Sequence, residues 1–367
     1  MRIAIAVGQL NRKAGPSVNG IRLARALRER RHDVWVVHRT APEAVDAGWA
    51  DEFRDCLLSL PFLHPCDPRY SLAFLRQIRD ARPDVVHFNL QTDALILSPV
   101  ARLLGVRTLY TMRNLLEYNA GWIQSGLKVI GPLSIDRFAA VSGAVADNIV
   151  EHRLCRVPPA IIYNGVEDND RRRLDETRSR IRQELGVRNG DLLVGTCGRL
   201  SPDKEQIHLL EALSLLGSRS PHMVIVGDGE MRPQLEHYCR EQGLNKVKLV
   251  GWQTDVSAFL SAVDVFAFHS MPDSEGLPTV VTEAAMMGLP LLLADIKCLR
   301  EVYVDGRHAL FAKPACASEF ADQLLRLLED SSLRTSIGSA AYEVAHAEFS
   351  IDTMADRYLA LYEETVA

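Results

Sequence analysis

One pattern recurs along the whole chain and restricts its fold more than any other: a short apolar segment, a polar loop and then an amphipathic helix. It begins with the apolar segment Arg2–Val7, a loop rich in Gly, Asn, Pro and Ser over residues 8–19, and apolar residues at helical spacing over 21–27. A second apolar segment, Val34–Val37, follows. Apolar runs that alternate with helices are typical of buried parallel strands, so the pattern predicts an α/β fold with a doubly wound sheet.

The alternation continues to Val166 and begins again near residue 191. Further strands are predicted at Cys56–Leu60, Pro83–Phe88, Arg107–Thr111, Arg137–Ser142 and Ile161–Val166, and then at Leu192–Cys197, Met223–Val226, Val247–Val250, Asp264–Phe268, Leu291–Ala294 and His308–Phe311. Residues 167–182 are highly charged and nearly without large apolar side chains, which is typical of a connection between domains. We therefore predict two Rossmann-like doubly wound domains at 1–166 and 191–349. A linker region at 167–190 joins them, and a last amphipathic helix at about 350–367 is expected to pack back on the N-terminal domain.

Composition narrows the class of protein. Apolar residues make up 47% of the chain, but no apolar run reaches the ~18 residues of a membrane-spanning helix. Met1–Val7 is too short for the apolar core of a signal peptide, so a cytoplasmic location is expected. The seven cysteines are odd in number, are scattered and form no Cys-x-x-Cys, which argues against disulfides and zinc. Asp168 and Asp170 resemble a metal pair only superficially, because they lie in the charged connection, and we expect neither a metal nor a cofactor.

Charge is distributed unevenly between the two halves. Residues 1–165 hold 21 Lys and Arg against 15 Asp and Glu, whereas the whole chain has a net charge of −5. A basic first half suggests an anionic partner, although two folded halves can also differ by chance. The cluster Arg28–Arg31 and the loop at Trp122 and Ile123 would allow peripheral docking to an anionic membrane. We expect no nucleic-acid partner.

The segment after the strand Asp264–Phe268 contains the residues most suggestive of a binding site. A helix is predicted to start at Pro278, which suits the first helical position, and to stop at Gly288. Glu275 then lies in the loop at the carboxyl end of the strand, and Glu283 lies about a turn and a half into the helix. These two glutamates can be solvated surface acids, as most charged residues are. The alternative is that both accept hydrogen bonds from one ligand.

The residues between the two glutamates favour that alternative. The free N–H groups of Gly276, Leu277 and Thr279 lie at the positive end of the helix dipole, which suits a phosphate. Two fixed acceptors on either side of a phosphate seat suit a ligand with hydroxyls at both ends and phosphate in the middle. A sugar nucleotide has that form.

Other polar residues fall at the carboxyl ends of predicted strands, where open α/β sheets bind ligands. In the first half these are His87, Asn89, Arg113 and Asn114. The first loop lacks the Gly-x-Gly-x-x-Gly fingerprint of dinucleotide-binding proteins. Within it, Gly15 can allow a phosphate to approach the backbone or can be an ordinary turn glycine.

The motifs together resemble those of the retaining glycosyltransferases of family 4, which have the GT-B fold of two Rossmann-like domains. The main match is Glu275-Gly-Leu-Pro-Thr-Val-Val-Thr-Glu283. Weaker matches, in family order, are Pro83-Asp84-Val85-Val86-His87, Tyr163-Asn164-Gly165-Val166, Gly198-Arg199-Leu200, Asp203-Lys204, Gly227-Asp228-Gly229 and Gly288-Leu289-Pro290.

The resemblance implies a role for most of these residues. Arg199 and Lys204 are expected to bind the donor diphosphate and to neutralise the charge of the leaving group, so that no metal is needed. Glu275 is expected to face the C3 and C4 hydroxyls of the transferred sugar, and Glu283 the ribose hydroxyls. The donor-binding residues implied are Gly15, Gly198, Arg199, Lys204, Glu275, Gly276, Leu277, Pro278, Thr279 and Glu283. His87, Asn89, Arg113 and Asn114 are expected to face the acceptor or the sugar, and Arg199, Lys204 and Glu275 are the expected catalytic residues.

The sequence departs from the family pattern at several positions. Ala14 stands in place of the first glycine of the first loop, Glu205 replaces a glycine after Lys204, and residues 295–300 replace a glycine-rich turn. Where a histidine is common after the fifth strand, this chain has Arg113. A planar guanidinium can bind a carboxylate or phosphate of a substrate, or can instead pair with a nearby Glu or Asp.

The activity implied is transfer of a hexose-type sugar, with retention, from a nucleoside diphosphate sugar, UDP-linked in our expectation, to an acceptor hydroxyl. Cell-surface polysaccharide, glycolipid or glycoconjugate synthesis would supply a carbohydrate or lipid-linked acceptor. Three alternatives stay open at this point: a sugar-nucleotide 2-epimerase with the same fold, a tailoring glycosyltransferase with a small soluble acceptor, and a non-catalytic protein that binds nucleotide sugars.

Overall fold

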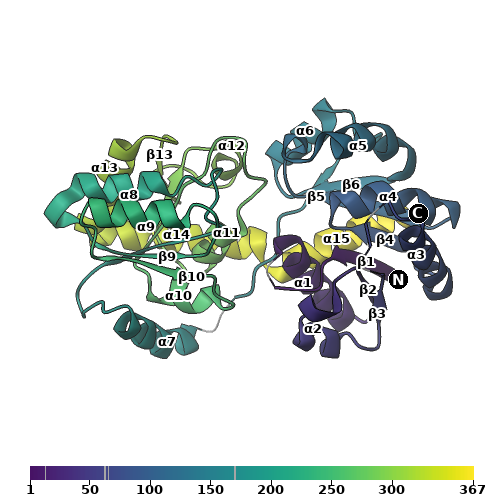
Figure 1. The fold of residues 1–367 in the computed structure, drawn as a ribbon, viewed down its shortest axis with the longest axis horizontal. Helices are drawn as coiled ribbons and strands as arrows, with labels where there is room; N and C mark the ends of the chain where they lie inside the picture. The colour runs from purple at the N-terminus through teal and green to yellow at the C-terminus, as the bar shows by residue number, and fades with distance from the viewer. Residues whose placement is uncertain (13, 62, 65, 169–170) are drawn as a thin grey trace. The chain divides into compact units, whose positions relative to one another are not determined.

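A computed structural model describes residues 1–12, 14–61, 63–64, 66–168 and 171–367, and the chain divides into two compact units (Figure 1). The N-terminal unit consists of Met1–Gly165 together with Ile351–Ala367, and the C-terminal unit consists of Val166–Ser350. Both units are α/β, as the alternating pattern predicts. Asp170 lies outside the described residues, so the metal-like pair that it would form with Asp168 is not described.

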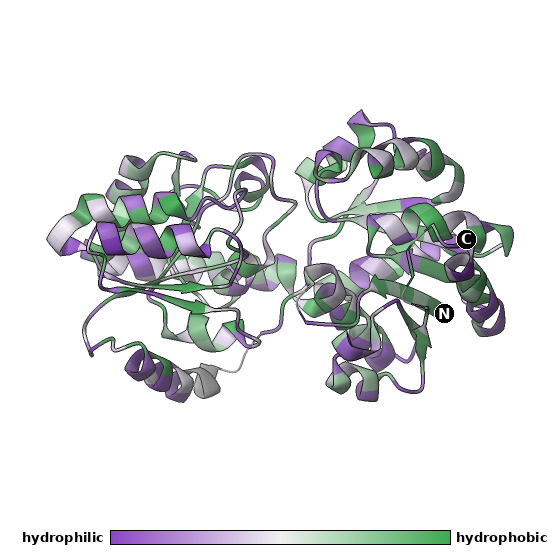
Figure 2. Ribbon diagram, in the orientation of Figure 1, coloured by the Kyte–Doolittle hydropathy of each residue, from purple (hydrophilic) through white to green (hydrophobic). Residues whose placement is uncertain are grey.

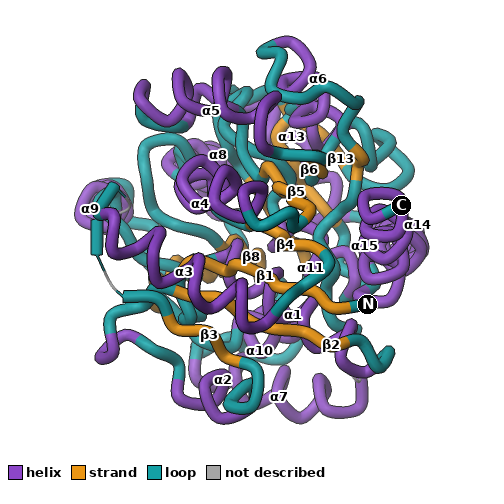
Figure 3. Tube along the Cα trace, turned by 90° about the vertical axis from the view of Figure 1, so that its right-hand side faces the viewer, coloured by secondary structure: helices purple, strands orange, loops and turns teal. Residues whose placement is uncertain are grey.

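The N-terminal unit is built on a seven-stranded parallel sheet with the strand order β3-β2-β1-β4-β5-β6-β7, which Figure 3 shows as neighbouring orange segments. The strands are β1 Arg2–Gly8, β2 Asp33–His38, β3 Leu57–Ser59, β4 Val85–Phe88, β5 Arg107–Met112, β6 Arg137–Ala140 and β7 Ala160–Ile161. The helices are α1 Gly15–Glu29, α2 Ala47–Glu52, α3 Pro68–Ala81, α4 Gln91–Leu103, α5 Gly121–Ser134, α6 Gly143–Glu151 and α15 Ile351–Val366, with short 3-10 turns η1 Pro42–Ala44 and η2 Leu116–Tyr118.

The C-terminal unit is built on a six-stranded parallel sheet with the order β10-β9-β8-β11-β12-β13. Its strands are β8 Leu193–Cys197, β9 His222–Val226, β10 Val247–Gly251, β11 Val265–Phe268, β12 Leu291–Ala294 and β13 Leu310–Ala312. Its helices are α7 Arg171–Glu184, α8 Ile207–Leu216, α9 Arg232–Glu241, α10 Val256–Ala262, α11 Thr279–Met286, α12 Lys297–Arg300, α13 Ala317–Glu329 and α14 Ser331–Phe349, with the 3-10 turn η3 Gly217–Arg219. In both units the strands are apolar and the outer helices carry most of the polar colour (Figure 2).

Helix α7 corrects the prediction of a linker at 167–190. Two of its arginines, Arg178 and Arg182, are one helical turn apart and both bind the carboxylate of Asp264, at 2.5 and 2.9 Å. Arg178 also donates to the carbonyl groups of Ser261 and Val263. The charged segment is therefore a helix of the C-terminal unit, and ion pairs hold it against the rest of that unit. A pattern of apolar residues does not reveal contacts of this kind.

The last helix, α15, packs in the N-terminal unit against α1, β4 and β5, and Figure 1 shows it in yellow among these purple and blue elements. Its Tyr362 and Tyr358 join a buried polar network. His87 Nδ1 lies 2.7 Å from the Tyr362 hydroxyl, His87 Nε2 lies 2.7 Å from Thr111 Oγ1, and Thr111 Oγ1 lies 2.8 Å from the Tyr358 hydroxyl. Burial lowers the pKa of His87, and the charge of Arg113 adds to this effect.

This network corrects the expectation that His87 faces a ligand. His87 is fully buried and both of its ring nitrogens are used by neighbours. Although it lies near the carboxyl end of β4, α15 covers it. His87 therefore anchors the last helix to the sheet.

Replacing Tyr362 by Phe tests this anchor. The substitution removes the hydroxyl that pairs with His87 Nδ1 and leaves a buried polar atom without a partner. The free energy of unfolding should fall by about 1–3 kcal/mol, which urea titration would measure. Tyr238→Phe is the control, because the contact of its hydroxyl with Ser214 is long, at 3.5 Å. An equal, small change in both variants would contradict the role given to His87.

The basic cluster and the aromatic loop proposed for membrane docking look different in the structure. Arg28 binds Asp55 at 2.8 Å and Arg30 binds Asp352 at 2.6 Å, so acids of the same unit neutralise both. Trp122 is half exposed in the first turn of α5, whereas Ile123 is buried. No described helix combines the length and apolar character needed to cross a membrane.

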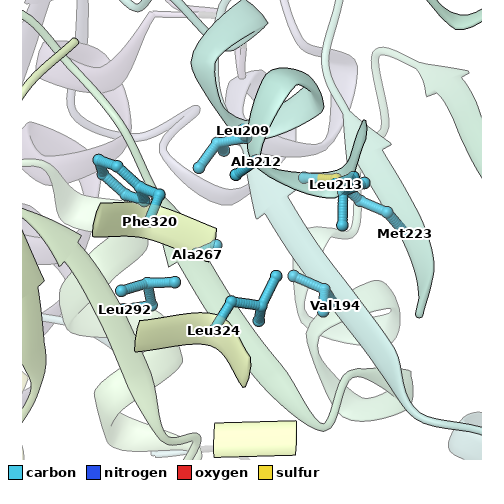
Figure 4. Close-up of a pocket in the computed structure, with 9 residues that line it drawn as sticks. All are labelled: Val194, Leu209, Ala212, Leu213, Met223, Ala267, Leu292, Phe320 and Leu324. Atoms are coloured by element: carbon cyan, nitrogen blue, oxygen red, sulfur yellow. The ribbon is translucent and has the colours of Figure 1, made fainter. Parts of the chain in front are cut away.

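A small void lies in the core of the C-terminal unit, between the sheet and helices α8 and α13 (Figure 4). It is lined entirely by apolar residues, namely Val194, Leu209, Ala212, Leu213, Met223, Ala267, Leu292, Phe320 and Leu324. With no polar group to hold water or a charged ligand, it is a packing gap and not a binding site.

Candidate functional site

The loop that follows β8 carries Arg199 and Lys204, and two glycines of a neighbouring loop hold it in place. Leu200 N donates to the Asp228 carbonyl at 3.0 Å, and Met231 N donates back to the Leu200 carbonyl at 3.0 Å. A Cβ atom on Gly227 would lie 1.9 Å from the Gly198 carbonyl oxygen, and one on Gly229 would lie 2.2 Å from that of Leu200. The glycines of the Gly227–Gly229 motif therefore allow the backbone of their loop to contact the backbone of the loop that carries Arg199.

Lys204 and Glu275 are brought together by the fold. The Lys204 ammonium lies 2.5 Å from Glu275 Oε1 and 3.1 Å from Asp203 Oδ2, and all three side chains are largely buried. Burial alone would lower the pKa of Lys204, but the carboxylates of Glu275 and Asp203 outweigh it and raise that pKa. Burial also opposes ionisation of Asp203, yet bonds from Ser201 and Lys204 lower its pKa. Lys204 and Asp203 are thus charged at neutral pH.

Arg199 is held more loosely than Lys204. Its side chain is 71% exposed and lies 3.7 Å from Asp203, while its Nε lies 3.2 Å from Ser201 Oγ. Its backbone carbonyl accepts a hydrogen bond from the Gln206 side chain at 2.9 Å, so the loop is fixed while the guanidinium is not. An exposed guanidinium beside a buried ammonium gives the loop two cations, one free to move and one fixed.

Residues at the end of β11 fix the backbone of the Lys204 loop. The Asp203 carbonyl accepts from Met271 N at 3.0 Å and from Ser270 Oγ at 3.1 Å. His269 Nδ1 lies 3.1 Å from the Lys204 carbonyl, which can only accept, and His269 Nε2 lies 3.1 Å from Ala315 N, which can only donate. His269 is therefore neutral with its proton on Nδ1, and burial lowers its pKa to about 4.

Helix α11 begins one residue later than predicted, with Pro278 as its N-cap and Thr279 as its first residue. Gly276, Leu277 and Pro278 are buried, while Glu275, Thr279 and Glu283 are partly exposed. Burial, followed by the negative charge of Glu283, raises the pKa of Cys197 at the end of β8 to about 12, so Glu283 lies near the same strand end as Gly198.

The carboxyl end of α11 matches the predicted stop. Gly288 takes a φ of +70°, and its N–H donates to the Ala285 carbonyl while Leu289 N donates to Ala284. These are the two hydrogen bonds of a Schellman motif, which glycine accommodates without strain. Glu205, which stands where the family usually has a glycine, also has a positive φ, of +42°. This left-handed conformation accounts for the glycine usual at that position.

One group of described residues has the spacing of a metal site: Glu205, His208 and His269, whose ligand atoms lie within 4.8 Å of one another. His269 cannot contribute a free lone pair, because its Nε2 already accepts from Ala315 N. His208 Nδ1 lies 2.7 Å from Glu211, which gives it a partner outside the group. The closeness of these three residues therefore reflects the packing around a neutral His269 and does not indicate a metal.

The N-terminal unit contains the other predicted residues. Gly15 is the first residue of α1 and has open space around the position of a Cβ, so it is not a glycine forced by a turn. Within the described part of the chain, Arg113 binds neither Glu nor Asp, contrary to one expectation; its two Nη atoms donate to Asn164 Oδ1 and, at 2.5 Å, to Asn89 Oδ1. Asn89 is buried, whereas Asn114 is exposed.

Sequence reasoning gave no role to Asp203, His269 or Ser270, although all three support Lys204. Asp203 adjoins Lys204 in the sequence and offers a carboxylate beside a cation, which is a usable signal. The roles of His269 and Ser270 depend on backbone carbonyls 65 and 67 residues away, and no local pattern reveals them.

Comparison with known proteins places the chain in a family. The family model "Glycosyltransferase Family 4" matches residues 18–170, and "Glycosyl transferases group 1" matches residues 177–344. A lipopolysaccharide core biosynthesis glycosyltransferase of Rhizobium meliloti, LpsE, is 31% identical over 170 residues, which is 46% of this chain and 49% of that protein. The putative teichuronic acid biosynthesis glycosyltransferase TuaC of Bacillus subtilis is 26% identical over 280 residues, 74% of this chain and 68% of that protein. The chain thus spans about half the length of the first relative and about two thirds of the second.

Among solved structures, Anabaena Alr3699/HepE in complex with UDP-glucose has a TM-score of 0.84 and 21% identity, and covers 99% of this chain and 100% of that one. This likeness concerns the fold alone. With the two family models matched in order over residues 18–344, the chain is a member of the family 4, group 1 glycosyltransferases and has their GT-B fold.

Proposed function

We propose that this chain is a retaining glycosyltransferase that moves a hexose-type sugar from a UDP-linked donor to an acceptor hydroxyl in cell-surface polysaccharide or glycoconjugate synthesis. The observation that supports this most is the Lys204–Glu275 pair beside Arg199, at the carboxyl ends of β8 and β11. The relatives named for lipopolysaccharide and teichuronic acid synthesis, and the neighbour that binds UDP-glucose, support the substrate class.

The charges of the site fit the departure of a diphosphate. The Lys204 ammonium has three N–H donors, and within the described part of the chain Glu275 and Asp203 take two, which leaves one for a phosphate oxygen. The exposed Arg199 can add a bidentate contact. Because negative charge grows on the diphosphate as the sugar leaves, these contacts strengthen in the transition state and accelerate the reaction. The two cations supply this stabilisation without a metal.

Glu275 can serve both sides of this reaction. Its Oε1 fixes Lys204, while its Oε2 receives no hydrogen bond from the residues that the structure describes. A free carboxylate oxygen is a strong acceptor for a sugar hydroxyl. In the transfer we propose, the bond from the anomeric carbon to the diphosphate breaks, the acceptor oxygen bonds to the same face, and its proton passes to the leaving phosphate.

Binding of the donor provides the first test. UDP and UDP-glucose should raise the unfolding temperature of the intact chain, by about 2–4 °C once their concentration is about tenfold above Kd, because a ligand of the folded state stabilises by mass action. GDP-mannose is the comparison ligand. Arg199→Ala should abolish the response, whereas Arg326→Ala, an exposed arginine of α13, should keep it. No response to any nucleotide sugar, or an equal response in Arg199→Ala, would contradict the proposed site.

The fate of the sugar then separates transfer from the open alternatives. Incubation of a matched UDP-sugar without an acceptor should leave that sugar unchanged apart from slow hydrolysis. Conversion into its 2-epimer would establish the epimerase instead. Binding with no product, when lipid-linked and soluble acceptors are both supplied, would support the non-catalytic alternative.

A further inference from the structure

Arg113 is a cation to which the described residues supply no countercharge. It follows the last residue of β5, and two side-chain amides hold its guanidinium: Asn89, just past β4, and Asn164, beyond β7. Amide oxygens orient a guanidinium but carry no net charge to neutralise it. Among the residues that the structure describes, none of the acids pairs with Arg113.

The acids nearest in the chain are engaged elsewhere. Asp93, in the first turn of α4, binds Arg39 at 3.2 Å and the Tyr70 hydroxyl at 3.0 Å. Glu117, in the segment after β5, binds His152 at 2.5 Å. The chain therefore contains suitable carboxylates on both sides of Arg113 and directs each of them to another partner.

The surroundings of Arg113 also disfavour an isolated positive charge. The residue is half-buried, and burial lowers its pKa. Its Nε is buried and finds no hydrogen-bond partner among the residues that the structure describes. It lies at the carboxyl edge of a parallel sheet, where helices such as α4 present their positive amino ends. A partly desolvated cation in a positive potential is stabilised when an anion binds beside it.

We propose that Arg113, held between Asn89 and Asn164, binds an oxyanion of a sugar substrate, either a carboxylate or a phosphate. Two of its five N–H groups are used by the asparagines, so the guanidinium keeps donors for a planar or tetrahedral anion. As an anion site the inference stands on the N-terminal unit alone. As a substrate site it rests on the glycosyl transfer proposed above, and it specifies an acidic sugar or sugar phosphate as the substrate.

Thermal unfolding of the intact chain with three related probes tests this inference at constant ionic strength. Glucuronate carries a carboxylate, glucose 6-phosphate carries a phosphate, and glucose carries no charge. One of the two acids should raise the unfolding temperature by about 2–4 °C near tenfold its Kd, and glucose should not. Arg113→Gln should abolish that shift. Arg113→Lys, which keeps the charge but loses the planar fork, should weaken a carboxylate response more than a phosphate response.

Arg199→Gln is the matched control, because it removes an arginine from the proposed donor site of the other unit. It should keep the response to the acidic sugar and lose the response to UDP, whereas Arg113→Gln should do the reverse. If UDP produces no shift while the acidic sugar still does, the proposed transfer fails and the anion site stands. A response that persists in both Arg113 variants, an equal response to glucose, or no response to either acid would overturn the anion site.

Discussion

Lys204→Met should lower kcat/KM with a UDP-sugar donor by about two to three orders of magnitude, the loss typical when one preorganised group that stabilises developing charge is removed. The ammonium is largely buried and lies 2.5 Å from Glu275 and 3.1 Å from Asp203, so no neighbouring cation can move into its place without disrupting both pairs. Methionine preserves the length and apolar stem of the side chain. The measurement is steady-state kinetics together with a urea titration of each variant.

Stability and activity should respond differently in a double variant. Lys204→Met alone leaves two largely buried carboxylates beside an uncharged side chain, and removing one partner of a buried pair costs about 3–5 kcal/mol. Adding Glu275→Gln removes one of those charges, so the double variant should recover much of the lost stability. It should recover none of the activity, because the diphosphate still lacks its cation and the sugar its carboxylate acceptor.

This divergence separates a functional pair from a purely structural one. If the Lys204–Glu275 contact only held two loops together, activity per folded molecule would return in the double variant along with stability. Recovery of both quantities would therefore contradict the catalytic role of Lys204. Arg199→Lys keeps a positive charge at an exposed position, so it should change the free energy of unfolding little. It should still lower activity, because lysine lacks the planar fork that makes a bidentate contact with the diphosphate.

The sequence was sufficient to predict the alternation of elements and most strand positions, because short apolar runs between helices admit few other folds. It was not sufficient where polar contacts replace apolar ones. Helix α7 was predicted as a linker because it has few large apolar residues, yet Arg178 and Arg182 dock it on Asp264. The predicted strand Ile161–Val166 differs from the observed β7, Ala160–Ile161, and Val166 forms an isolated bridge with Ser350 instead.

The candidate site, like the fold, was predictable from the sequence only in part. The motif predicted that Lys204 and Glu275 serve one ligand, but their direct contact depends on strand order. In the sheet β8 lies beside β11, although β9 and β10 intervene in the chain, so two loops 71 residues apart meet at one edge. His87 shows the converse error: it lies near the end of β4 at the expected edge, but only the packing of α15 reveals that Tyr362 covers it.

Gly227→Ala should damage the donor site without touching any residue proposed to contact the donor. Its Cβ would lie 1.9 Å from the Gly198 carbonyl oxygen, and its φ of +137° is one that side chains rarely adopt. Relief requires a shift of the backbone that carries Arg199. The free energy of unfolding should fall by about 2–4 kcal/mol, which combines overpacking with the cost of an unfavourable backbone conformation.

Gly243→Ala is the matched control for this substitution. Gly243 also has a positive φ, +64°, but has open space where a Cβ would lie. It should lose only about 1 kcal/mol and should keep the thermal response to UDP. Gly227→Ala should lose that response even at temperatures where it is fully folded, because the Arg199 loop is displaced. If folded Gly227→Ala binds UDP as tightly as Gly243→Ala does, the Gly227–Gly229 turn supports only the fold, and the contacts with Ser201, Asp203 and Gln206 set the position of Arg199.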